Sequence, residues 1–217
     1  MDPFKIFDCT LLSKMSGLRP AVNLRELRDR VALCSSNVLY HHFCETPLVP
    51  LFDYPDYRND FAIWARHHLR DEILAERLGI IDPYAHACLE DLRAAVLEII
   101  DDHLSERTMV PWAPPGRELY FMESITVVFD TGERIDHPDG LAAAIDKMTH
   151  GSIYFHFLEA RRRPPLGLDD FTAWLETLSG DQRSHITAIA SIDFPFYTLA
   201  EIKKTLVSVL SNKEPFA

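Results

Sequence analysis

Glycine is scarce in this chain, at 8 of 217 residues. Neither a Gly-x-Gly-x-x-Gly segment nor a Walker loop occurs, and these are the loops whose backbone cradles phosphate groups. No run reaches the roughly 18 apolar residues that a membrane span needs. The first residues do not form a basic stretch followed by an apolar one, so we expect no secretory signal. These absences argue against a nucleotide-binding loop and against a membrane protein.

Basic side chains are also in deficit, with 22 Lys and Arg against 33 Asp and Glu, for a formal net charge of −11. Nucleic-acid backbones and anionic membranes repel such a chain, so we expect neither as a partner. The four cysteines, Cys9, Cys34, Cys44 and Cys88, show no Cys-x-x-Cys spacing. Thiols in this pattern indicate a reduced, cytoplasmic protein.

The most informative pattern is an internal repeat. The segment 40–45 (YHHFCE) returns as 154–159 (YFHFLE), 114 positions later (154 − 40), and 59–64 (NDFAIW) returns as 169–174 (DDFTAW), 110 positions later (174 − 64). Apolar positions of 89–100 return in 199–210 at the same distance of 110 (199 − 89). Solenoid repeats are shorter, at about 20–50 residues. The period therefore indicates two homologous halves.

Helical periodicity dominates both halves, with about four expected helices in each. The sequence predicts a mainly α fold of two homologous helical repeats with pseudo-two-fold symmetry, and a possible short strand at the start of each half. Segment 4–12 is ambiguous between strand and helix, whereas 119–129 is rich in β-formers. The expected organisation is a first repeat (1–104), a Pro-rich linker (105–116) and a second repeat (117–217), packed as one globular body.

Two helix starts carry capping signals. Asn23 is expected to cap a helix that runs to about Cys34 and buries Leu24, Leu27 and Val31. Segment 198–201 (TLAE) has the form of a capping box ahead of the last helix.

The repeated His-x-x-Glu places His42 with Glu45 and His156 with Glu159. Two such helices facing one another would offer two imidazoles and two carboxylates to a divalent metal, the one cofactor that the sequence suggests. The alternative is a structural hydrogen-bond network between buried imidazole and carboxylate groups. A lone His-x-x-Glu is a weak metal signal, so the structural alternative is favoured and no cofactor is expected.

Aromatic residues gather in the loop 46–58, which holds Phe52, Tyr54 and Tyr57 among three prolines, Pro47, Pro50 and Pro55. Such a loop either packs over the core or faces a partner. Together with Tyr40 and Tyr154, these three aromatic residues are the candidate binding residues.

The chain resembles an uncharacterised bacterial and archaeal family, the domain-of-unknown-function family 5752. The resemblance implies a cytoplasmic, two-repeat protein, and it implies no reaction, cofactor or catalytic residue. It covers nearly the whole chain and is carried by 24–27 (LREL), 40–43 (YHHF), 59–64 (NDFAIW), 74–78 (LAERL), 152–161 (SIYFHFLEAR) and 170–176 (DFTAWLE).

Three functions are compatible with these patterns. The leading hypothesis is a non-enzymatic binding or accessory protein that holds a protein or small-molecule partner through the aromatic loop and the groove between the repeats. The second is a metal-dependent enzyme that uses the four His and Glu residues. The third is a structural homodimer, expected if an apolar face stays exposed after folding.

Overall fold

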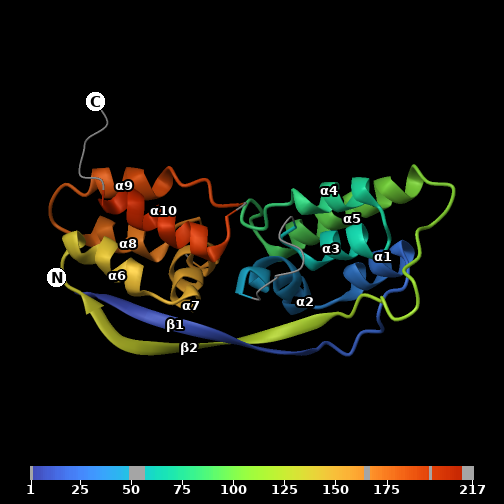
Figure 1. Ribbon diagram of the computed structural model, residues 1–217, viewed down its shortest axis with the longest axis horizontal. Helices are drawn as coiled ribbons and strands as arrows, with labels where there is room; N and C mark the ends of the chain where they lie inside the picture. Colours follow the sequence, from blue (N-terminus) through green and yellow to red (C-terminus); the bar gives the residue numbers. More distant parts are fainter. Residues whose placement is uncertain (1, 49–56, 164–166, 196, 212–217) are drawn as a thin grey trace. The chain divides into compact units, whose positions relative to one another are not determined.

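The computed structural model describes residues 2–48, 57–163, 167–195 and 197–211, which belong to two compact units (Figure 1). Unit 1 consists of Met1–Leu11 and Thr126–Ala217, and unit 2 consists of Leu12–Ile125. The division does not follow the order of the sequence, because the first residues of the chain belong to the unit that holds the last helices.

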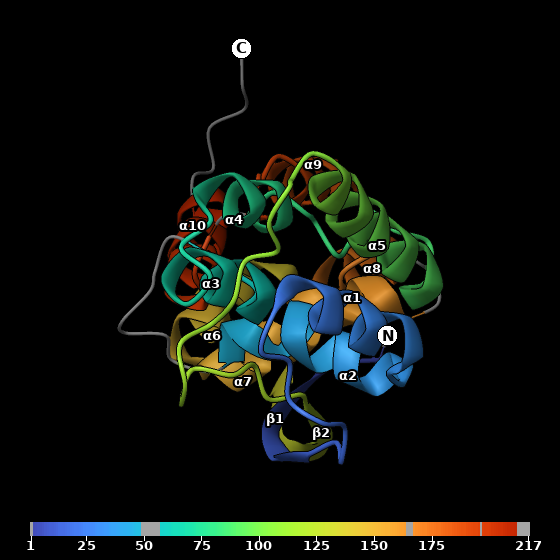
Figure 2. The same cartoon turned by 90° about the vertical axis from the view of Figure 1, so that its right-hand side faces the viewer.

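The described residues of unit 2 form five α-helices. α1 packs on α5, and α3 packs on α4 (Figure 2). A π-helical turn follows α2 directly. The bounds are α1 Leu24–Leu33, α2 Ser36–Tyr40, the π-turn His41–Glu45, a 3-10 turn Thr46–Leu48, α3 Asp60–His67, α4 Glu72–Gly79 and α5 Leu89–Ser105.

Unit 1 repeats this order of helices. α6 packs on α10, α8 packs on α9, and a π-helical turn directly follows α7. The bounds are a 3-10 turn Pro138–Gly140, α6 Leu141–Lys147, α7 His150–Ile153, the π-turn Tyr154–Leu158, a 3-10 turn Glu159–Arg162, α8 Asp170–Thr177, α9 Arg183–Ala190 and α10 Leu199–Ser211.

Two long strands, β1 (Phe4–Met15) and β2 (Met122–Ile135), form a two-stranded antiparallel sheet (Figure 1). Each strand has residues in both units, because the units divide β1 after Leu11 and β2 after Ile125. The start of β1 therefore lies with helices of the second half of the sequence, and the start of β2 lies with helices of the first half.

The prediction of a mainly α fold was wrong. The strands are 12 and 14 residues long, so the protein is a helix-rich mixed structure and not a helical one with short strand fragments. The physical reason is exposure: most side chains of β2 are exposed or half-buried, so the strand lacks the alternation of buried and exposed positions that marks a half-buried strand.

The strand segments complete the apolar cores. In unit 1, Phe4 and Ile6 are buried, and the Phe4 ring lies 5.3 Å from that of Phe171 in α8. In unit 2, Leu119 and Phe121 are buried with the helices, and the Phe121 ring lies 6.3 Å from that of Phe61 in α3. Each helical group is thus covered by a segment from the other half of the sequence.

Both predicted caps are confirmed. The Asn23 side chain accepts a hydrogen bond from the Glu26 amide, and α1 buries Leu24, Leu27 and Val31. At the start of α10, the Glu201 amide donates to Thr198 Oγ1 while the Thr198 amide donates to the Glu201 carboxylate. No helix among the described residues is both long and apolar enough to cross a membrane.

We expect Phe4→Ala to speed hydrogen exchange in α8 while leaving α3 unchanged, because Phe4 packs in unit 1. Truncating a buried Phe costs about 3–5 kcal/mol. Phe121→Ala is the matched control, with the opposite pattern of faster exchange in α3 and unchanged α8. Mass spectrometry of peptides from the two helices measures both. Faster exchange in α3 on truncation of Phe4 would contradict the assignment of the strand segments.

Candidate functional site

The two histidines singled out by the repeat lie in the π-turns that follow α2 and α7. His42 and His156 are both almost fully buried, with side-chain exposures of 2% each. A π-turn inside a helix is rare and often marks a functional position. In each unit, the π-turn places an imidazole next to the strand that packs on the helices of that unit.

His42 has a hydrogen-bond partner at each ring nitrogen. The Met122 amide of β2 donates to Nε2 at 3.0 Å, so Nε2 carries a lone pair and no proton. The proton of the neutral ring therefore lies on Nδ1, which donates to Asp60 Oδ2 at 2.6 Å. The ring links the first residue of β2 to the first residue of α3.

His156 makes the same contacts in unit 1. The Phe7 amide of β1 donates to Nε2 at 2.9 Å, and Nδ1 donates to Asp170 Oδ2 at 2.7 Å. Asp170 also accepts from Arg163 at 2.9 Å, and the Arg163 guanidinium lies 4.2 Å over the Phe155 ring. Neither imidazole has a lone pair left for a metal ion.

A tryptophan in each unit holds the strand segment at a second point. Trp64 Nε1 donates to the Arg117 carbonyl at 2.8 Å, and Trp174 Nε1 donates to the Asp2 carbonyl at 3.2 Å. Each carbonyl precedes the amide bound by histidine by five residues (122 − 117 and 7 − 2). The two units therefore use the same pair of side chains at the same spacing along the strand segment.

His42 and His156, two of the predicted metal ligands, are hydrogen-bonded to aspartates. His42 bonds to Asp60, whereas Glu45 contacts Nδ1 of His41 at 2.9 Å. Glu159 lies in the 3-10 turn after the second π-turn, and burial raises the pKa of its carboxyl group. No group of three or more His, Cys, Asp or Glu that could hold a metal ion occurs among the described residues.

A cluster of polar side chains surrounds His41, whose position in the second repeat is taken by Phe155. Ser124 Oγ lies 2.6 Å from His41 Nδ1 and 3.0 Å from Ser13 Oγ. A Ser-His-acid relay requires the hydroxyl and the carboxylate at opposite ring nitrogens. Because Ser124 and Glu45 both meet Nδ1, His41 does not connect them as a relay.

The aromatic candidates are dispersed. Tyr154 is fully buried, and Tyr40 and Tyr57 are half-buried against the core of unit 2. Tyr57 packs closely on α4, where a Cβ atom at Gly79 would lie 2.7 Å from its ring. Phe52 and Tyr54 lie outside the described residues.

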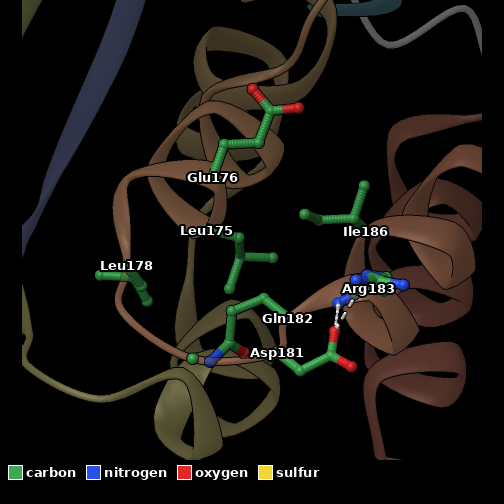
Figure 3. Close-up of a pocket in the computed structure, with 8 residues that line it drawn as sticks. Leu175, Glu176, Leu178, Asp181, Gln182, Arg183 and Ile186 are labelled. Atoms are coloured by element: carbon green, nitrogen blue, oxygen red, sulfur yellow. Dashed lines mark hydrogen bonds and ion pairs between the residues drawn. The ribbon is translucent and has the colours of Figure 1, made fainter.

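One pocket of unit 1 lies between the end of α8 and the start of α9. Leu175 and Ile186 face one another there, and Asp181 pairs with Arg183 at its rim (Figure 3). The side chains of Asp181 and Arg183 are 74% and 90% exposed, so this ion pair is solvated and contributes little binding energy. The pocket brings together no set of catalytic groups.

Sequence reasoning missed Asp60 and Asp170 as the partners of the histidines. The His-x-x-Glu spacing pairs each histidine with the glutamate three positions later, whereas the aspartates lie 18 and 14 positions away in the next helix. A usable signal was present, because the aspartates recur in the two halves together with the histidines. Ser124 carried no comparable signal.

A family model and a solved structure match this chain. The model of the family of unknown function DUF5752 matches residues 1–211. The solved structure of OrfY from Thermoproteus tenax is 26% identical, with a TM-score of 0.77 over 97% of this chain and 94% of that one. The search of curated proteins found no match.

Replacing His156 by Ala should destabilise unit 1, because the Phe7 amide and the Asp170 carboxylate lose a buried partner. Each buried group left unsatisfied costs about 1–3 kcal/mol. Exchange of the Phe7 amide should accelerate, and His42→Ala should have the same effect at Met122. His150→Ala, which truncates an exposed histidine of α7, is the control. Equal exchange rates in the His150 and His156 variants would refute the structural role.

Proposed function

We propose that this chain, which belongs to the family DUF5752, is a non-enzymatic binding or accessory protein that holds a protein partner. The observation that carries this proposal is the exposure of apolar side chains on the strands. Val127, Val128 and Phe129 are consecutive in β2 and are 39%, 40% and 48% exposed. Consecutive side chains of a strand point to opposite faces, so both faces of β2 are open to solvent here.

Exposed apolar side chains in the part of the sheet that belongs to unit 2 give further support to a binding role. Leu12, Met15 and Ile125 are 60%, 58% and 60% exposed. Single exposed apolar residues are ordinary, but a succession of them along one element marks an interaction surface. The half-buried loop residue Tyr57, together with Phe52 and Tyr54, remains a second candidate contact.

The polar side chains support a binding role over a catalytic one. His42 and His156 are engaged at both ring nitrogens, by a strand amide and by a carboxylate. A general base needs a lone pair that is directed at a substrate, and a metal ligand needs one that is directed at the ion. The histidines instead hold the strands in place.

We also infer that the chain arose by internal duplication and acts in the cytoplasm. The duplication is supported by the recurrence of the histidine, aspartate and tryptophan contacts in both units. The cytoplasmic location is supported by the cysteine content without paired spacing.

Affinity capture from the native host tests the proposal, with partners counted by quantitative mass spectrometry. The double variant Val127→Ser/Phe129→Ser should lose a stoichiometric partner by about tenfold or more, because the loss of buried apolar area weakens binding. Leu33→Ser in α1 is the control, because Leu33 is 77% exposed and distant in sequence from both strands. The control should capture the partner as the wild type does.

A parallel variant, Phe52→Ala/Tyr54→Ala, separates the loop from the strands. Loss of the partner in this variant alone would show that the loop, and not the strands, binds the partner. Absence of any stoichiometric partner from the wild-type capture would contradict the binding role itself.

A further inference from the structure

The sheet has one continuous register, which fixes the direction of each amide. Ser13 lies beside Ser124 in unit 2, and Thr131 Oγ1 donates to the Ile6 carbonyl in unit 1. From Ile6 to Ser13 the residue number rises by seven (13 − 6), and from Thr131 to Ser124 it falls by seven (131 − 124). Both pairs therefore fit the same antiparallel alignment. The ladder therefore runs between them without a net bulge.

The amide of Val128 lies on the outer edge of β2. Met122 N–H points away from β1, since it donates to His42 in unit 2. In a regular strand, amides separated by an even number of residues point to the same edge. Val128 is six positions on (128 − 122), so its N–H also points away from β1.

In unit 1, the helices cover the outer edge of β1, where the Phe7 amide donates to His156. The outer edge of β2 carries no such contact at Val128: across the described ranges, its amide has no hydrogen bond outside the ladder. An open strand edge flanked by exposed apolar side chains is a template for pairing with another strand.

The charge beside this edge selects the occupant. The end of β2 and the residues after it carry Asp130, Glu133, Asp136 and Asp139, against Arg134 and against Lys5 of β1, whose charge acts on Asp130. The hydrogen bond from the Arg134 guanidinium lowers the pKa of Asp130 to about 2, so this carboxylate is ionised at neutral pH. With a net charge of −11 on the whole chain, a second copy would be repelled and a basic segment attracted.

We propose that the outer edge of β2 around Val128 binds an extended segment of alternating basic and apolar residues from the protein partner, which adds to the sheet as a further strand. The proposal rests on the binding function above and names the chemistry of its partner. Backbone hydrogen bonds to the edge give the affinity, Val127 and Phe129 contact the apolar residues, and the negative charge around the strand attracts the basic ones.

The probe is a synthetic peptide of alternating Lys and Val, titrated into the full-length 15N-labelled protein. Saturating peptide should slow hydrogen exchange of the Val128 amide by about tenfold or more, because a pairing strand buries that N–H. Added salt should weaken binding by screening the charges. A peptide of alternating Glu and Val, which has the same backbone and apolar content, should not bind.

Val128→Pro tests the backbone pairing directly. Proline removes an N–H that makes no internal bond, and edge positions tolerate it. This variant should keep wild-type exchange in α8 and lose the Lys-Val peptide, whereas Val128→Ala keeps the amide and should retain binding. Glu133→Lys/Asp136→Lys, which leaves the Asp130–Arg134 pair intact, should reduce affinity for the Lys-Val peptide.

Each contrary result has a distinct meaning. An unprotected Val128 amide at saturating Lys-Val peptide, or equal binding of the Glu-Val peptide, overturns the proposal. If partner capture still depends on Val127 and Phe129, the binding function survives that failure. Light scattering of the protein alone gives the last outcome: a mass twice the 24.9 kDa of the chain that is lost in Val128→Pro assigns the edge to a second copy and also overturns the proposal.

Discussion

A backbone amide of a strand donating to an unprotonated imidazole nitrogen is the interaction on which this structure depends. A two-stranded ribbon is marginally stable in water by itself, so β1 and β2 need contacts outside their own ladder. His42 accepts from Met122 in unit 2, and His156 accepts from Phe7 in unit 1. In each unit a carboxylate fixes the imidazole tautomer, so that the accepting nitrogen faces the strand.

These hydrogen bonds attach each strand to helices from the other half of the sequence. The start of β1 joins the helices of the second half, and the start of β2 joins those of the first half. Neither half of the sequence therefore holds a complete unit. Phe4 of β1 and Phe121, the residue before β2, are buried in the two cores, but β2 is open at Val128. The same connectivity that completes two cores thus leaves part of the sheet exposed, and the proposed binding surface lies there.

Features set by local physics were predictable from the sequence. Asn23 and the pair Thr198 and Glu201 cap helices through contacts within one turn, and the sequence identified both. The length of the strands was underestimated because the exposed middle of the sheet lacks an alternation of apolar and polar residues. The strands also pair segments that are far apart in the sequence, which no local pattern reveals. The histidine partners were missed because the pairing of His with Glu three positions later assumes an α-helix, whereas His42 and His156 lie in π-turns.

The tautomers of His42 and His156 test the central claim most directly. Long-range 15N–1H correlation spectra of the imidazole rings at neutral pH distinguish a protonated from an unprotonated ring nitrogen. The account predicts a proton on Nδ1 and a bare Nε2 in both histidines, with His150 behaving as a solvent-exposed ring. A proton on Nε2 of either buried histidine would contradict it, because that nitrogen could not accept the strand amide.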